Sequence, residues 1–426
     1  MGSVPGFVVP LSAPEASDPS RFGAKAANLA ALAQAGLPVP EGFCVDAQAY
    51  RIQLSALGLE ESARGVFSSE DRPRARRCAL ETKLGLMQGA IVPEVREALL
   101  SAWRSIAGEG RPGVVRSSAL VEDRAGSSFA GQFQSYLGLE NDEDFLIAVR
   151  ACWAALWSTR ALRYMATHDL NPADTAMAIL VQPLVPARAA GGGLSRAASG
   201  EMLVNAAQGP GAAVAQGEVV PDRYVLDRAG RVKESALGQK YHALSCAHGR
   251  RAFSRAFFGA PCLDAEQLAE LALLMHKCEG IVGGPAEIEW AQDDTGINLL
   301  QARPLAVASA QVPDEIWLKH PGLNGHPSGI GWGEGRARVV NCECGLERVG
   351  PGDVLVTTVA GPALSEVLPH VSAVVAELGG STSHLASLAR ERGVPMVLGV
   401  LDATRRIPDG STVAVDGVSG VVRWMQ

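Results

Sequence analysis

The feature that most limits the possible folds of this chain is the segment at residues 306–328, which separates two well-patterned regions. The segment is rich in Pro, Gly, Asn and His. Boundaries between domains commonly fall in stretches of this composition. The sequence therefore predicts a larger domain at residues 1–305, a linker at 306–328 and a smaller domain at 329–426.

Signals for helices and strands alternate along both regions, which favours a mixed α/β fold. Residues 23–35 predict an Ala-rich helix that is closed by Gly36 and followed by Pro38. The Gly- and Ser-rich stretch at 191–200 predicts a loop, and residues 353–357 and 373–377 predict short buried strands. With 426 residues, of which 47% are hydrophobic, the chain has enough material for two or three domain cores.

Composition argues against several classes of protein. A formal net charge of -7 disfavours binding to nucleic acid or to an anionic membrane, both of which need clustered Lys and Arg. The start of the sequence does not resemble a secretory signal, and no stretch is apolar for long enough to cross a bilayer. Among the eight cysteines, only Cys342 and Cys344 are close, and their spacing matches no common zinc pattern. We therefore expect a cytoplasmic protein with reduced thiols.

A first candidate site lies around Arg116. Residues 114–118 end a predicted strand, and the Ser- and Gly-containing run at 127–132 follows after an acidic loop. Small residues in such a turn let backbone N–H groups and hydroxyls surround phosphate oxygens, and Arg116 and Lys25 would add positive charge. An ordinary surface loop is the alternative.

A second candidate is a predicted β-hairpin formed by residues 286–290 and 297–304. Strand periodicity places Glu287 and Glu289 on one face, and Gln301 and Arg303 share a face of the partner strand. If these faces coincide, the carboxylate and amide oxygens suit Mg²⁺ beside a polyphosphate. The alternative is a solvated face with cross-strand charge pairs.

The third candidate is His384. Paired glycines end a predicted strand, hydroxyl residues can cap a new helix, and His384 falls in the first turn of that helix. A neutral imidazole is a usable nucleophile near pH 7, and its phosphorylated form would be an anion at a helix N-terminus. A structural His in a helix cap is the alternative.

In this order, the motifs resemble the phosphoenolpyruvate synthase and pyruvate phosphate dikinase family, which also includes the rifampicin phosphotransferases. The resemblance covers nearly the whole chain. The matching segments are residues 23–29, 36–40, 116–118, 128–132, 181–182, 221–224, 287–290, 300–304 and 379–384.

The resemblance implies an ATP-grasp domain followed by a swivelling phosphohistidine domain, with ATP and Mg²⁺ as cofactors. By this resemblance, Lys25 and Arg116 hold the ATP phosphates, and the loop of Ser128, Phe129, Ala130, Gly131 and Gln132 covers them. Gln182 lies at the adenine. Glu289 and Gln301 ligate Mg²⁺ with Glu287 nearby, and Arg303 lies on the transferring phosphate.

The implied activity is that of a dikinase-type phosphotransferase. His384 would attack the β-phosphate of ATP and later pass the phosphoryl group to a small-molecule acceptor, with release of AMP and inorganic phosphate. One histidine must then visit two sites, which a small domain hinged on a flexible segment allows. The acceptor is not identified by the sequence.

Three departures from the family pattern support alternative hypotheses. Residues 191–196 and 208–211 differ from the usual segments near the nucleotide, which is a reason to consider an ATP-binding regulator that has lost catalysis. The sequence also ends at Gln426, without the pyruvate-binding barrel of the synthases or the acceptor domain of the rifampicin enzymes. A nucleotide-binding subunit of a split phosphoenolpyruvate synthase, with its acceptor site on a separate partner protein, is therefore a further alternative.

Overall fold

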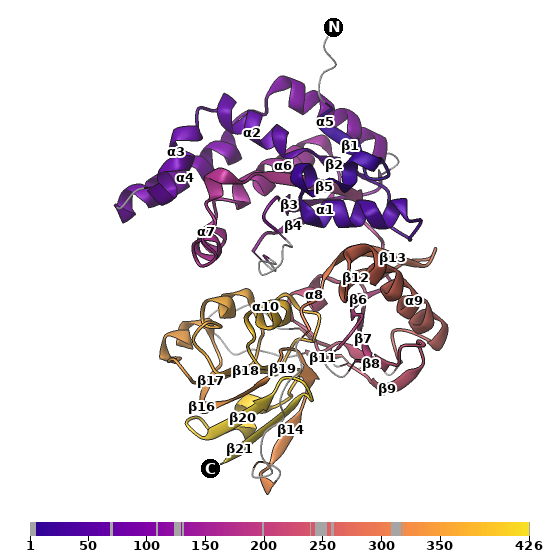
Figure 1. Ribbon diagram of the computed structural model, residues 1–426, viewed down its shortest axis with the longest axis vertical. Helices are drawn as coiled ribbons and strands as arrows, with labels where there is room; N and C mark the ends of the chain where they lie inside the picture. The colour runs from indigo at the N-terminus through magenta and orange to yellow at the C-terminus, as the bar shows by residue number, and fades with distance from the viewer. Residues whose placement is uncertain are drawn as a thin grey trace. The chain divides into compact units, whose positions relative to one another are not determined.

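The chain folds into two compact units. The computed structural model describes residues 6–68, 71–107, 110–122, 129, 132–197, 200–238, 240–242, 254–256, 260–307, 317 and 319–425. Unit 1 consists of Met1–Val185 with Leu299–Ala302, and unit 2 consists of Pro186–Asn298 with Arg303–Gln426 (Figure 1). The division falls inside the predicted domain at 1–305, so most of its second half belongs with the C-terminal region.

Unit 1 is built on an antiparallel sheet with helices packed against it. Its strand order is β1 (Val8–Pro10), β2 (Phe43–Val45), β5 (Met177–Pro183), β3 (Gly113–Ala119) and β4 (Ser135–Leu139). The helices are α1 (Pro19–Gln34), α2 (Ala47–Ala56), α3 (Glu60–Ser68), α4 (Arg72–Gln88), α5 (Pro93–Ile106), α6 (Asp142–Ala155) and α7 (Thr159–Ala166).

Helix α1 explains how Lys25 is positioned. Asp18 caps the helix by accepting from the Ser20 N–H at 2.9 Å, and Pro19 suits the first turn because it lacks an N–H that would need a partner. Gly23 interrupts the helix with φ of 72°. A Cβ there would lie 2.5 Å from the Ser118 carbonyl oxygen, so only glycine lets α1 press against β3 at this point. Lys25 follows the kink directly.

The span Asp142–Ala166 is long and apolar enough, by length and composition, to pass as a membrane helix. It consists of two helices, α6 and α7, separated at residues 156–158. Half of the apolar window is buried inside the protein, where α6 packs on β3 and β5. We interpret this span as two helices that contribute to the core of unit 1.

The first sheet of unit 2 has the order β13 (Ile297–Pro304), β12 (Ala286–Gln292), β6 (Ala189–Leu194), β7 (Met202–Gln208), β8 (Asp222–Leu226) and β9 (Val232–Ala236). Helix α9 (Ala265–Val282) packs against β12 and β6. The short elements α8 (Ala212–Ala215), β10 (Lys240–His242) and β11 (Ser254–Ala256) complete this region. The loop predicted at 191–200 is wrong in its first half, because residues up to Leu194 form β6.

Three glycines in β6 let other groups approach the sheet closely. A Cβ on Gly191 would meet the Asn205 carbonyl oxygen at 1.9 Å, and one on Gly193 would meet Met275 of α9 at 2.7 Å. A Cβ on Gly192 would lie 2.5 Å from Cβ of Thr382 in the C-terminal region. Because successive residues of a strand face opposite sides, α9 covers one face of this sheet and the C-terminal region contacts the other.

The C-terminal region of unit 2 is an eight-stranded mixed sheet. Its order is β14 (Gly322–Asn324), β21 (Val421–Met425), β20 (Thr412–Asp416), β16 (Trp332–Val340), β17 (Val354–Thr357), β18 (Ala373–Ala376), β19 (Met396–Leu398) and β15 (His326–Pro327). The four strands β16 to β19 are parallel neighbours. The helices are α10 (His384–Arg392) and the short α11 (Ala403–Arg406).

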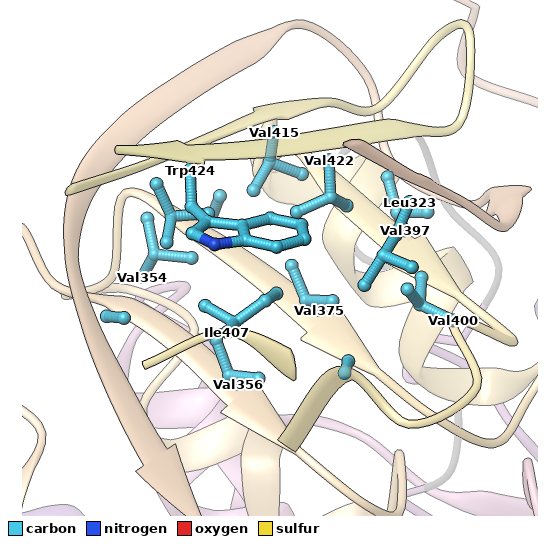
Figure 2. Packing of buried hydrophobic residues seen from close by; sticks show 14 residues of the cluster. Leu323, Val354, Val356, Val375, Val397, Val400, Ile407, Val415, Val422 and Trp424 are labelled. Atoms are coloured by element: carbon cyan, nitrogen blue, oxygen red, sulfur yellow. The ribbon is translucent and has the colours of Figure 1, made fainter. Parts of the chain in front are cut away.

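The core of this region is aliphatic, and the Trp424 ring lies among Val354, Val375, Val415 and Val422 (Figure 2). The predicted strands at 353–357 and 373–377 are confirmed as β17 and β18. The range predicted as a linker, 306–328, contains β14 and β15, which pair with β21 and β19. Among the described residues, the strands of this region therefore begin at Gly322, six residues before the predicted end of the linker.

Glu279 on α9 is expected to make the stability of unit 2 depend on pH. Burial opposes its ionisation, but hydrogen bonds from Arg228 and Ser195 and the charge of Arg228 outweigh burial and lower the pKa of the Glu279 carboxyl from 4.5 to about 2. A depressed pKa stabilises the fold above the unfolded value of 4.5, and the contribution is lost as pH falls towards 2.

Replacing Glu279 with Gln should therefore lower the free energy of unfolding near neutral pH, and the difference from the parent protein should shrink below pH 4.5. Urea denaturation at a series of pH values would measure this. Glu270→Gln, at an exposed position of the same helix, is the matched control and should show no such trend. A difference that stays constant down to acidic pH would contradict the assignment.

Candidate active site

The site residues predicted from the sequence fall into two sets, one in each unit. Unit 1 contains Lys25, Arg116, Phe129, Gln132, Gln182 and Gln301, and unit 2 contains Glu287, Glu289, Arg303 and His384. Ser128, Ala130 and Gly131 lie outside the described residues.

Lys25 is buried and has an acidic partner. Its Nζ lies 2.5 Å from Glu122 Oε1 and 3.2 Å from the Ser117 carbonyl oxygen. Glu122 also accepts a hydrogen bond from the Ala119 N–H at 3.2 Å, which fixes the carboxylate at the end of β3. Burying an ammonium group requires such compensation. Glu122 was not predicted, although it belongs to the acidic loop that follows the Arg116 motif.

Arg116 and Gln301 lie together despite the long sequence separation. The Arg116 guanidinium donates to the Leu300 carbonyl oxygen at 2.5 Å and to Gln301 Oε1 at 3.0 Å. An amide oxygen that accepts from a guanidinium is held in a defined direction. The two predicted residues therefore form one polar group, on β3 and β13.

The remaining predicted residues of unit 1 have structural partners. Gln182 is buried and donates to the Pro40 carbonyl oxygen at 2.8 Å. Phe129 is buried with φ of 51°, an uncommon conformation for a residue with a side chain, and its ring stacks on Phe133 at 5.4 Å between centroids. The Gln132 N–H donates to the Phe129 carbonyl oxygen at 3.0 Å.

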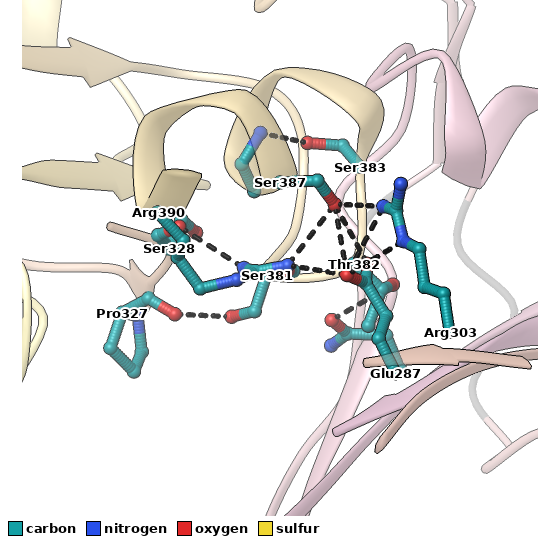
Figure 3. Close-up of polar contacts among 11 residues, drawn as sticks. Glu287, Arg303, Pro327, Ser328, Ser381, Thr382, Ser383, Ser387 and Arg390 are labelled. Carbon is teal, nitrogen blue, oxygen red and sulfur yellow. Dashed lines mark hydrogen bonds and ion pairs between the residues drawn. The ribbon is translucent and has the colours of Figure 1, made fainter. Parts of the chain in front are cut away.

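In unit 2, Glu287 is the centre of a buried charge network that joins the hairpin to α10 (Figure 3). Arg303 Nη2 lies 3.1 Å from Glu287 Oε2, and Arg390 Nη2 lies 3.1 Å from the same oxygen. The Ser387 hydroxyl donates to Glu287 Oε1 at 2.8 Å and accepts from Arg303 at 2.5 Å. One carboxylate thus holds guanidinium groups from both the hairpin and the C-terminal region. We call these four residues the Glu287 network.

Burial and charge act in opposite directions on Glu287. Burial favours its neutral form, but the charges of Arg303 and Arg390 and the Ser387 hydrogen bond outweigh that effect and lower the pKa of the Glu287 carboxyl. Burial lowers the pKa of the Arg390 guanidinium, although Glu287 opposes this shift. Glu287 is therefore an ionised group that depends on its two partners.

The register of the sheet shows which residues share the face towards the C-terminal region. Glu289 pairs with Gly192, Gly192 with Asn205, and Asn205 with Arg223. Thr382 contacts this row, since its hydroxyl lies 3.4 Å from Asn205 Oδ1. The prediction that both hairpin glutamates share a face is confirmed by their pairing with alternate residues of β6.

His384 begins α10 close to this face. Ser383 caps the helix by accepting from the Ala386 N–H at 3.3 Å, and Gly379, with φ of 102°, turns the chain after β18. His384 is partly exposed, whereas the following residues of the helix up to Arg390 are buried. The predicted helix cap is confirmed.

A magnesium ion would have to draw ligands from a small set. Within the described residues, no three His, Cys, Asp or Glu side chains gather in a way that could hold a metal. Mg²⁺ is commonly held by one or two carboxylates together with phosphate oxygens, so a complete protein cage is not required. Glu289 is partly exposed and suits that role, whereas Glu287 is occupied by two guanidinium groups. The donor set therefore fits a metal that arrives with a polyphosphate.

Gly192 permits the close approach of Thr382, so Gly192→Ala should weaken the contact between the sheet and the C-terminal region. The new Cβ would lie 2.5 Å from Thr382 Cβ, which must move away. Hydrogen exchange of the backbone at residues 381–390, followed by mass spectrometry, should become faster. Gly284→Ala, where a Cβ meets nothing within 4 Å, is the control. Adding Thr382→Gly to Gly192→Ala should restore slow exchange, and unchanged exchange in the single variant would contradict the contact.

Sequence reasoning missed three residues at the contact between the sheet and α10: Asn205, Ser387 and Arg390. None had a sequence signal of its own, although Ser387 and Arg390 lie in the helix that begins at His384. Their spacing of three residues places both on one side of α10. That spacing was the available clue, but it did not reveal which strand they contact.

Comparison with known proteins places these features in context. A family model described as pyruvate phosphate dikinase, AMP/ATP-binding domain, matches residues 19–319, and one described as PEP-utilising enzyme, mobile domain, matches residues 349–420. The chain is 32% identical to phosphoenolpyruvate synthase of Aeropyrum pernix, over 94% of this chain and 56% of that protein. It is 30% identical to phosphoenolpyruvate synthase of Escherichia coli, over 95% of this chain and 55% of that protein. The chain thus spans about half the length of these curated relatives.

Proposed function

The chain belongs to the pyruvate phosphate dikinase and phosphoenolpyruvate synthase family, and from this premise we propose that it is an ATP-dependent phosphotransferase that works through phospho-His384. An imidazole nitrogen attacks the β-phosphorus of ATP, the bond from that phosphorus to the α-phosphate oxygen breaks, and AMP leaves. The γ-phosphoryl group is lost to water as inorganic phosphate. The phosphoryl group that remains on His384 then passes to a small-molecule acceptor.

The observation that carries this proposal is the position of His384. The residue is partly exposed at the start of α10, while Ser387 and Arg390 of the same helix engage Glu287 and Arg303 of the hairpin. Free N–H groups in the first turn of a helix favour the phosphate anion that would form there. Arg303 donates to Ser387, three residues after His384 on the same helix, so the helix that carries the proposed nucleophile also contacts a guanidinium that would stabilise the developing charge.

The charged residues have separable roles in the proposal. Lys25 and Arg116 bind ATP phosphates, Phe129 and Gln132 belong to a covering turn, and Gln182 lies at the adenine. Arg303 stabilises the transferring phosphoryl group, as arginines do in other phosphoryl transfers. These roles require Lys25 to exchange Glu122 for phosphate.

Magnesium would neutralise charge on the phosphates and hold them in line for attack. Glu289 and Gln301 are the proposed ligands, and Glu287 supports them through its contact with Arg303. In this proposal Glu287 acts by positioning Arg303 and does not itself need to touch the metal.

The half-reaction tests the proposal without knowledge of the acceptor. Protein incubated with Mg-ATP labelled in the β-phosphate should acquire an acid-labile label and release AMP, whereas label in the γ-phosphate should appear as inorganic phosphate. Binding of ATP without labelling or AMP release would exclude the transfer and favour the regulator hypothesis.

A second candidate keeps the chemistry but has the acceptor site on another polypeptide. The match covers 56% and 55% of the two phosphoenolpyruvate synthases, and the test of this candidate is whether a further polypeptide is needed. A protein that forms the labelled intermediate, but turns over only when a partner chain is added, would match this candidate. We place the protein in the cytoplasm, which agrees with the free thiols among its described cysteines.

A further inference from the structure

Unit 2 contains a cavity of about 100 Å³ between the six-stranded sheet and the C-terminal region. Its floor is a row of apolar residues that pair across the strands: Leu194 with Leu203, and Leu203 with Val225. Leu305 packs on the first two of these residues. Residues of the C-terminal region that also line the cavity are Pro327, Ile330 and Val418.

Charged side chains surround this apolar row, and the sum of their formal charges is positive. Three arginines, Arg196, Arg223 and Arg390, line the cavity together with Glu201 and Glu234. Both glutamates already have cationic partners, since Glu201 pairs with Lys233, and Glu234 pairs with Arg223 at 2.9 Å. An anion that entered would therefore meet guanidinium groups, of which Arg223 keeps its contact with Glu234 through Nη1.

Two of the arginines have unused hydrogen-bonding capacity. Arg223 Nε is buried and has no hydrogen-bond partner among the described residues. Buried donors in folded proteins are nearly always satisfied, so this donor beside the cavity is open to an acceptor from outside the chain, either water or a ligand. The exposed Arg196 guanidinium makes no polar contact with the described residues.

We propose that this cavity binds a small carboxylate with a short apolar chain. The carboxylate would accept from Arg196 and Arg223, and the apolar chain would lie on the row from Leu194 to Val225. A cavity of this volume accommodates roughly seven water molecules, or an organic acid of about the same number of non-hydrogen atoms. This proposal does not depend on phosphoryl transfer by His384.

The walls of the cavity come from two parts of unit 2, so the ligand binds fully only while the C-terminal region is docked on the sheet. Arg390 belongs to both the cavity and the Glu287 network. A bound carboxylate therefore stabilises the docked arrangement. Ligands that bind only one of two arrangements shift the population towards it.

Binding should be tested on the whole chain with linear monocarboxylates from acetate to hexanoate, by titration with ligand-observed NMR. Butan-1-ol and butylamine serve as neutral and cationic probes of matched length. We expect butyrate to bind about tenfold or more tightly than either, because hydrogen bonds to charged groups are worth more than neutral contacts. Failure of every carboxylate to bind, or equal binding of butan-1-ol, would overturn the proposal.

Variants then locate the site. Arg196→Glu should weaken butyrate binding about tenfold or more, and Arg196→Lys should retain part of the affinity. Because Arg196 is exposed, neither change threatens the fold. Arg336→Glu, at another exposed arginine of unit 2, is the control and should leave binding unchanged. Unchanged affinity in Arg196→Glu would show that butyrate binds elsewhere.

Discussion

Replacing His384 with Ala is expected to abolish phosphoenzyme formation and to lower AMP release from Mg-ATP by about 10³-fold or more, because the proposed nucleophile is removed and the remaining groups only bind and polarise the nucleotide. Quenched reactions with labelled ATP, analysed for acid-labile protein label and for AMP, would measure both quantities. The fold should survive, since His384 is partly exposed and the Ser383 cap of α10 remains.

The control for this variant is His370→Ala, at an exposed histidine in the same region. It should retain labelling and AMP release. ATP binding by His384→Ala should remain close to that of the parent protein, because the phosphate-binding candidates Lys25 and Arg116 are untouched. AMP release that continues at the parent rate in His384→Ala would remove the basis for the phosphohistidine route.

Replacing Glu287 with Gln should lower the free energy of unfolding by about 3–5 kcal/mol, the usual effect of removing one partner from a buried ion pair. Here the neutral amide leaves two buried guanidiniums, those of Arg303 and Arg390, without their common counter-charge. Thermal or urea denaturation followed by circular dichroism would measure the loss. Hydrogen exchange in α10 should also become faster, since the contact between the sheet and this helix is weakened.

Glu334→Gln is the matched control, because this exposed glutamate of β16 undergoes the same chemical change without a buried partner. Adding Arg390→Met to Glu287→Gln should recover part of the lost stability, since it removes one of the uncompensated charges. If Glu287→Gln is as stable as Glu334→Gln, the Glu287 network does not hold the C-terminal region to the sheet.

Local patterns predicted much of the architecture. The alternation of Glu287 and Glu289 with apolar residues gave the correct faces of β12, since a strand repeats every two residues. The glycines, hydroxyl residues and His384 gave the start of α10, because caps depend on only a few neighbouring residues. These are features in which the sequence neighbours are also the spatial neighbours.

Features that depend on distant contacts were harder to predict. The glycines of β6 suggested a loop, yet they lie in a strand. They are glycines because Asn205, Met275 and Thr382 lie too close to leave room for side chains. Only the folded sheet reveals that crowding. Likewise, neither Glu122 nor Arg390 could be assigned a partner from spacing, since Lys25 and Glu287 are 97 and 103 positions away in the chain.

The Glu287 network has a consequence for how the C-terminal region parts from the sheet. Ionised and hydroxyl groups recover hydration when they enter water, whereas apolar surfaces become prone to aggregation. Glu287 and Arg303 on one side and Ser387 and Arg390 on the other contribute charged and hydroxyl groups to the contact, so separation wets polar surface on both sides. These groups therefore help the protein to stay dispersed through repeated opening and closing in a crowded solution.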